Sequence, residues 1–194
     1  MLTCVFFFFE DLGIAKSSLY TSSMESRDYW DRLTLAGPKY GIYFNHNGRT
    51  GPSRDAHKLV HGALWELGPA GQSTVVDALF KGHFEEGRDV SDRAWLVQVG
   101  VAAGMRPEVC TAAVTSENLG CLVDDAVTAA MSDWKVRASP SLMVGSSVIR
   151  EKRYRIGGFQ AEPVFEDAFR RMHDAEAAVT LPHFCQLAAS IAAS

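Results

Sequence analysis

The stretch Gly48-Arg-Thr-Gly-Pro-Ser-Arg-Asp-Ala-His-Lys-Leu59 carries the clearest structural signal in the chain. Its first half is dense in turn-forming residues and continues a loop that opens at Asn45. Ser53 then stands where a helix N-cap is expected, and apolar residues recur at helical spacing as far as Leu67. The sequence therefore predicts a loop that leads into an amphipathic helix over 53–67.

Further elements are predicted on both sides of this helix. Glycines at 68 and 71 end it, and four more helical patterns follow over 73–86, 92–101, 107–114 and 117–132. Before the loop we expect strands over 5–9 and 41–44, and after the helices a hairpin of 141–144 with 154–156. A final amphipathic helix is predicted over 162–173. The pattern indicates an α/β core (1–52 and 134–174), a helical insert (53–133) and a C-terminal tail (175–194), which is either a docking helix or a disordered end.

The composition is that of a packed globular protein. The 194 residues are 47% hydrophobic and 22% charged, with a formal net charge of −4. This balance excludes a disordered chain and gives no electrostatic reason to expect nucleic acid or an anionic membrane as a partner. The apolar start lacks the basic region of a signal peptide, and no apolar run reaches the roughly 20 residues that span a bilayer. We therefore expect a soluble protein of the cytoplasm.

The cysteines are Cys4, Cys110, Cys121 and Cys185, and they form neither a CxxC motif nor a zinc-finger spacing. In a reducing compartment we expect four reduced thiols. They are either buried small hydrophobic residues or reactive thiols.

Four motifs in order resemble the DsbA-like thioredoxin-fold proteins. The nearer branch is FrnE-like, alongside the 2-hydroxychromene-2-carboxylate isomerases and kappa-class glutathione transferases. The matching stretches are 48–59, 78–92, Ala-Ser-Pro-Ser-Leu-Met-Val at 138–144 and Gly-Gly-Phe-Gln at 157–160. The resemblance extends from Phe6 to Met172 and implies a thioredoxin-like α/β core with an all-helical insertion.

The resemblance also implies what the chain lacks. Members of this family begin with a strand, a CxxC (or a serine in the isomerase and transferase branch) and a helix. This chain is expected to start at the second strand of the family, so the usual redox centre is missing. The alternative is a start site assigned too late, in which case the protein is a thiol oxidoreductase or a glutathione-dependent enzyme.

Arg54, Asp55 and His57 open the predicted helix over 53–67 and are the leading site candidates. A helix N-terminus favours anions, so Arg54 is predicted to hold a carboxylate, enolate or thiolate, with Asp55 beside the substrate. His57 can exchange protons near neutral pH and is the predicted acid or base. The alternative is structural: Asp55 as a helix-start charge and His57 as a packing residue. His57 and His61 lack a third ligand, so we expect no metal.

The remaining candidates lie in the implied core. Tyr43 and Asn45 are predicted to line the cleft between core and insert. Pro140 resembles the cis-proline of the family, which offers a backbone ledge to an extended ligand, and Ser139 and Ser141 would add hydrogen bonds there. The alternative is an inherited turn that only maintains the fold.

These observations predict a non-redox isomerase or cyclase. Its substrate would be a small apolar or aromatic molecule of the secondary-metabolite kind, held in the cleft. No cofactor is expected, except that glutathione remains possible, and the protein is expected to be a homodimer because a sheet edge is left exposed. The alternative is a catalytically silent binding or scaffold protein, since a fold alone does not fix a function.

Overall fold

The computed structural model describes residues 14–20, 24–133, 135–136, 141–146, 148–149, 152–158 and 160–192. Contacts within the chain divide it into two units, one within Phe7–Thr128 and the other within Ala129–Ser194. The predicted strand over 5–9 lies outside the described residues. Among the helices described, none is long and apolar enough to cross a membrane.

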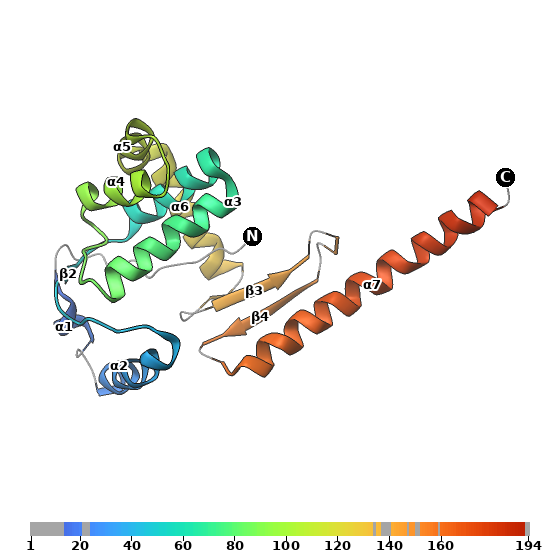
Figure 1. Ribbon diagram of the computed structural model, residues 1–194, viewed down its shortest axis with the longest axis horizontal. Coiled ribbons are helices and arrows are strands. Elements are labelled where there is room, and N and C mark those ends of the chain that lie inside the picture. The colour runs from blue at the N-terminus through green and yellow to red at the C-terminus, as the bar shows by residue number, and fades with distance from the viewer. Residues whose placement is uncertain are drawn as a thin grey trace. The chain divides into compact units, whose positions relative to one another are not determined.

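Helices make up most of the first unit (Figure 1). In chain order its elements are β1 (Ile14–Ala15), α1 (Lys16–Tyr20), α2 (Met24–Ala36), the 3-10 helix η1 (Gly37–Tyr40), β2 (Arg49–Thr50), α3 (Arg54–Phe84), α4 (Arg93–Ala102), α5 (Pro107–Thr115) and α6 (Glu117–Ser132), which runs past the boundary. The two short strands pair antiparallel, with Ile14 opposite Thr50.

Helix α3 is bent at the predicted stop. Gly68 has φ 75° and ψ −171°, a conformation that glycine adopts without steric cost. Pro69 follows and cannot donate a backbone hydrogen bond, so it begins the second half of the helix. That half starts four residues before the predicted Ser73. Ser53 occupies the N-cap position, as predicted, although its side chain makes no capping hydrogen bond.

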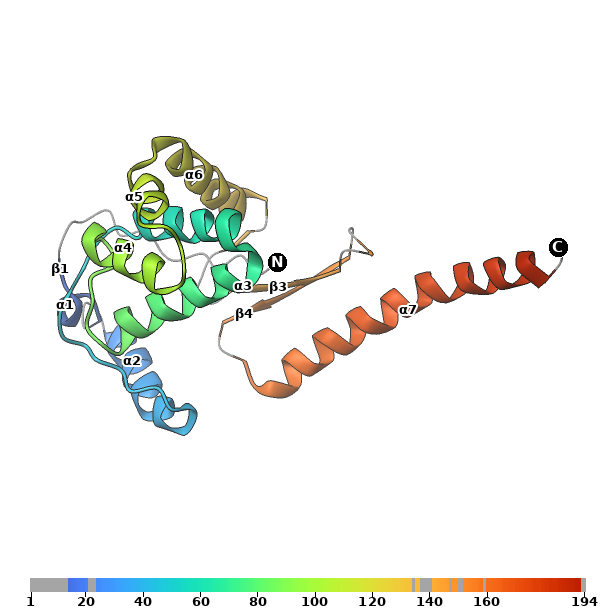
Figure 2. The same ribbon diagram turned by 45° about the horizontal axis from the view of Figure 1, so that its top comes forward.

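The hydrophobic core of the first unit lies where α3, α4 and α5 meet (Figures 1 and 2). Leu59, Leu79 and Leu96 are fully buried there, each stabilising the fold by about 2 kcal/mol relative to an exposed side chain. The start of α4 is fixed by Asp92, whose side chain accepts hydrogen bonds from the amides of Ala94 and Trp95. The predicted helices over 92–101, 107–114 and 117–132 are confirmed within one residue at each end.

The predicted strand over 41–44 is wrong. This segment has no regular secondary structure, because its backbone donors bond elsewhere. The amide of Ile42 donates to the carbonyl of Gly37, and that of Tyr43 donates to the Glu85 carboxylate. Both side chains are exposed, so the segment lacks the one buried face that a strand of a packed sheet needs.

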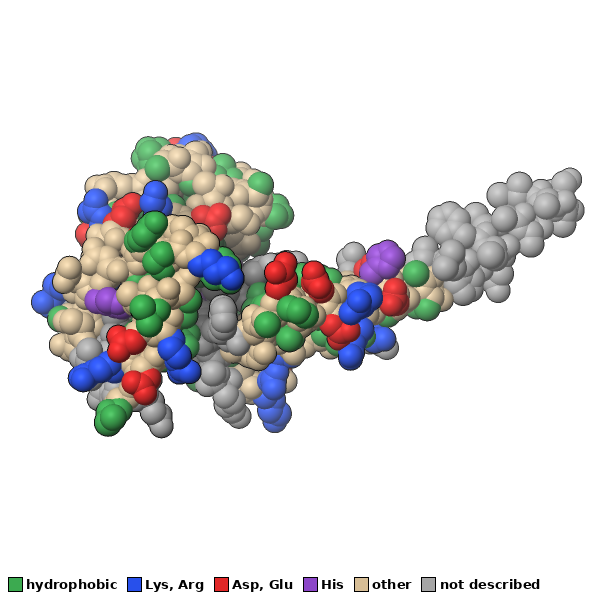
Figure 3. All heavy atoms as spheres, turned by 60° about the horizontal axis from the view of Figure 1, so that its bottom comes forward, with side chains coloured by type: hydrophobic (Ala, Val, Ile, Leu, Met, Phe, Trp, Pro, Cys, Tyr) green, Lys and Arg blue, Asp and Glu red, His purple; other side chains and the backbone are tan. Residues whose placement is uncertain are grey.

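The second unit contains a hairpin and a long helix. Strands β3 (Ser141–Gly145) and β4 (Arg153–Gly157) pair antiparallel with Leu142 opposite Ile156, which confirms the predicted hairpin. Helix α7 spans Glu162–Ala192, well beyond the predicted end at 173, and it contacts both strands. On the face that Figure 3 shows, acidic and basic side chains are mixed along the described part of α7.

Candidate functional site

The candidate residue Arg54 lies in a network of ion pairs between α3 and α6. Its Nε and Nη2 donate to Asp124 Oδ1 and Oδ2 at 3.0 and 2.9 Å, and its Nη1 lies 3.2 Å from Glu117 Oε2. The guanidinium lies against Gly120, where a Cβ would come within 2.1 Å of Nη2. The hydrogen bonds from Arg54 hold the pKa of the Asp124 carboxyl below its usual value.

Asp55 is held as tightly, by Lys58 and Arg93. Lys58 Nζ lies 2.7 Å from Oδ1 and Arg93 Nε lies 2.6 Å from Oδ2, so Asp55 joins the start of α3 to α4. Burial alone would raise the pKa of Asp55, but the two hydrogen bonds outweigh it and lower that pKa. Lys58 is itself fully buried and also donates to the carbonyl of Val114. The sequence analysis missed Lys58, because a lysine at helical spacing gives no sign of burial.

This network carries balanced charge. Its side chains are Arg54, Lys58, Arg93, Asp55, Glu117 and Asp124. A substrate anion at Arg54 therefore has to compete with two carboxylates that already neutralise the guanidinium. Arg54 and Asp55 join the start of α3 to α6 and α4. Their contact with a substrate stays a prediction.

His57 lies one turn into α3 and is 9% exposed. Its Nδ1 lies 2.8 Å from the carbonyl oxygen of Ser53. Because a carbonyl only accepts, Nδ1 carries the proton in the neutral ring and Nε2 is the accepting nitrogen. The ring is thus oriented as a general base requires. One turn further on, His61 is half-buried, and burial lowers its pKa. No group of three or more metal-ligating side chains occurs among the described residues.

Tyr43 and Asn45 contact the end of α3, whereas Arg54 and Asp55 contact α4 and α6. Asn45 donates its amide to the carbonyl of Phe84 at 2.7 Å and accepts the amide of Asn47 with its own side chain. The Tyr43 side chain is 66% exposed. The remaining candidates belong to the other unit: Ser141 begins β3 and is half-buried, while Ser139 and Pro140 lie outside the described residues. The predicted ledge stays a prediction.

A second buried lysine was missed by the sequence analysis. Lys16 is fully buried, and its Nζ donates to the carbonyls of His83 and Arg88. Burial lowers the pKa of Lys16 to about 8, against a smaller opposing effect of Asp89. Lys16 therefore ties the N-terminal segment to the end of α3 and to the loop after it.

The buried imidazole of His83 makes stability depend on pH. Burial and the nearby charge of Lys16 lower the pKa of His83 from 6.5 to about 4. Between these values the unfolded chain binds the proton and the folded chain does not, so stability falls as the pH falls from 6.5 to 4. The full loss is about 3 kcal/mol. Thermal denaturation over this range should show a steeper drop for the wild type than for His83→Gln. Equal slopes would contradict the assignment.

The described thiols are Cys110 on α5 and Cys121 on α6, and both are free. Cys110 is fully buried, and burial raises its pKa, with a further contribution from Glu66. Its thiol therefore stays protonated and is a poor nucleophile near neutral pH. Cys121 is exposed.

Comparisons with known proteins agree with this fold. No curated protein sequence matches the chain. Among solved structures, the chain is similar to the crystal structure of a protein from Nitrosomonas europaea that is provisionally named a protein disulfide isomerase. The TM-score is 0.57 at 18% sequence identity, over 78% of this chain and 71% of the other. At this identity the likeness shows a shared fold. The family model described as the DSBA-like thioredoxin domain matches residues 6–170, so the chain belongs to the DSBA-like thioredoxin domain family, with a thioredoxin-like α/β core and a helical insertion.

Proposed function

We propose that this protein is a non-redox enzyme, an isomerase or cyclase that acts on a small apolar or aromatic molecule. The observation that carries the proposal is the state of its thiols. The 194 residues contain no CxxC, and Cys110 is buried with a raised pKa. Dithiol exchange needs an accessible thiolate and a resolving cysteine beside it. Of the two thiols that the structure describes, Cys121 is exposed and Cys110 is buried, and they do not form a disulfide.

In this proposal His57 moves the proton. The hydrogen bond from Nδ1 to Ser53 holds the ring in one orientation. On a cyclic hemiketal substrate, Nε2 would take the hydroxyl proton as the bond between that carbon and the ring oxygen breaks, and would return the proton to the released oxygen. Such a ring opening is an isomerisation with no net gain or loss of atoms or electrons. Ser139, Pro140 and Ser141 would position the substrate, and Arg54 would stabilise its developing negative charge.

The test uses 2-hydroxychromene-2-carboxylate as the probe substrate, with and without glutathione. The change in ultraviolet absorbance measures the conversion. We expect the substrate to be converted without glutathione. Conversion that requires glutathione would support a glutathione-dependent enzyme instead.

The purified protein should show no disulfide reductase activity. In an insulin-reduction assay with dithiothreitol, turbidity should develop no faster with the protein than without it. The reason is again the missing dithiol pair. Turnover that disappears in Cys121→Ser, with Cys110→Ser as the buried control, would contradict this prediction and restore thiol chemistry.

One observation favours a second candidate function, a catalytically silent binding protein. The charges of Arg54 and Asp55 are already satisfied by neighbouring helices, as a structural role requires. Loss of His57 distinguishes the two functions, because only the enzyme loses an activity. Self-association stays a prediction, and light scattering at micromolar concentration tests it.

A further inference from the structure

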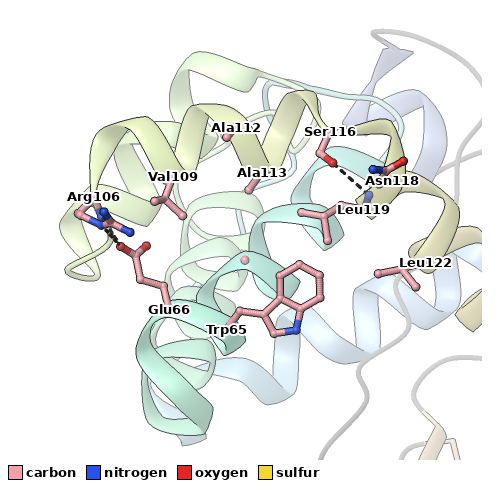
Figure 4. Close-up of a pocket in the computed structure, with 11 residues that line it drawn as sticks. Trp65, Glu66, Arg106, Val109, Ala112, Ala113, Ser116, Asn118, Leu119 and Leu122 are labelled. Atoms are coloured by element: carbon pink, nitrogen blue, oxygen red, sulfur yellow. Dashed lines mark hydrogen bonds and ion pairs between the residues drawn. The ribbon is translucent and has the colours of Figure 1, made fainter.

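A groove lies in the first unit between α3, α5 and the start of α6 (Figure 4). Its volume is about 600 Å³, which falls within the roughly 300–1,000 Å³ of typical small-molecule sites. Its apolar lining residues are Trp65, Val109, Ala112, Ala113, Leu119 and Leu122. The groove is separate from the ion pairs around Arg54.

The groove exposes large apolar side chains to solvent. Trp65 is 65% exposed and Leu122 is 45% exposed, although both belong to helices that pack well elsewhere. In Figure 4 the indole of Trp65 stands across the hollow from Leu119 and Leu122. Exposed indole next to aliphatic side chains is a surface that an aromatic ring can cover favourably.

One end of the groove carries a carboxylate that is only half satisfied. Glu66 Oε1 accepts a hydrogen bond from Arg106 Nε at 2.7 Å. Its other oxygen, Oε2, is buried, and no hydrogen-bond partner for it occurs in the part of the chain that the structure describes. A buried acceptor without a donor is costly, by about 1–3 kcal/mol. Glu66 is thus prepared for one more donor.

The charge at this end is negative. Arg106 Nη1 also lies 3.8 Å from Glu108, so one guanidinium faces two carboxylates and leaves a net charge of about −1. The Arg106 side chain is 68% exposed, so solvent leaves it room to exchange Glu66 for Glu108 as its partner, and this exchange would open a path to Glu66. A cation is therefore the ion that fits this end of the groove.

We propose that this groove binds a small aromatic amine. The ring lies against Trp65 and Leu122, and the protonated amino group donates to Glu66 Oε2. A neutral ring of the same size covers the apolar walls but leaves the negative end without a cation. An aromatic acid is repelled by Glu66 and Glu108. The site is independent of the catalytic proposal, because it shares no residue with His57, Arg54 or the predicted ledge.

The experiment compares three ligands with one ring system. Isothermal titration calorimetry on the full chain at pH 7 measures 1-naphthylmethylamine, 1-naphthalenemethanol and 1-naphthoate. We expect the amine to bind about tenfold more tightly than the alcohol, because a charged hydrogen bond is gained, and the acid to bind least. Equal affinities for the amine and the acid, or no binding of the amine, would overturn the proposal.

Variants place the ligand in the groove. Glu66→Gln should remove the preference for the amine over the alcohol. Ala112→Phe should fill the groove and weaken both ligands at least tenfold, whereas Leu35→Ala, an exposed apolar residue on α2, should change neither. If Glu66→Gln fails to fold, the order of the three affinities in the wild type and the affinities of Ala112→Phe still test the proposal. Amine binding that survives Ala112→Phe overturns the site, whatever the outcome of the isomerisation assay.

Discussion

Replacing His57 with alanine should lower the turnover of the isomerisation about 100-fold. The expected loss follows from the role of His57 as the proton carrier, with Nδ1 fixed on Ser53 and Nε2 as the base. The measurement is the initial rate at saturating 2-hydroxychromene-2-carboxylate. Because the ring is buried, the melting temperature has to be recorded in parallel, so that a loss of folding is not counted as a loss of chemistry.

His61→Ala is the matched control for this experiment. His61 lies one turn along the same helix, is half-buried and has no proposed catalytic role. It should keep its rate within a fewfold of the wild type. If His57→Ala also stays within a fewfold, at unchanged melting temperature, the acid–base role is wrong and aromatic walls that hold a reactive conformer become the better explanation.

Replacing Gly48 with alanine should lower the free energy of unfolding by about 3 kcal/mol. Gly48 has φ 91°, and a Cβ at this position would lie 2.2 Å from the carbonyl oxygen of Gly87. The backbone carbonyl of Gly48 also accepts the amide of Lys16. The loop at Gly48 and the loop at Gly87 cannot easily move away from each other, because Lys16 contacts both of them and the end of α3. Urea denaturation followed by circular dichroism measures the loss.

The control for the Gly48 variant is Gly41→Ala. Gly41 has a similar φ of 75°, but no atom lies within 4 Å of the position that its Cβ would take. This variant should lose only the cost of the left-handed conformation, about 1 kcal/mol. Equal losses in the two variants would mean that the approach of the two loops contributes nothing.

The sequence predicted those elements whose signals are local. The start of α5 at Pro107 and both ends of α6 follow from residues within one turn of each boundary. The segment 41–44 was misassigned because its hydrogen-bond partner Glu85 is 42 positions away from Tyr43. Periodicity contains no information on such a distant partner.

The same limit applies to the candidate site. His57 and Arg54 could be singled out because they open a helix, but the partners of Arg54 follow it by 63 and 70 positions. Only the tertiary fold brings Glu117 and Asp124 to the guanidinium. The burial of Lys58 and Lys16 could not be predicted for the same reason. Lysine is usually exposed, and these two side chains are buried by contacts with residues that are distant in the sequence.

The close approach of Arg54 to Gly120 has a consequence for which substitutions these positions tolerate. The guanidinium occupies the space that any side chain at 120 would need, and Asp124 anchors it in that place. A side chain at 120 therefore either displaces the guanidinium from Asp124 or requires a smaller residue at 54, and loss of Arg54 removes the reason to keep an acid at 124. Substitutions at positions 54, 120 and 124 should therefore be correlated, so that a change at one of them is accompanied by changes at the other two.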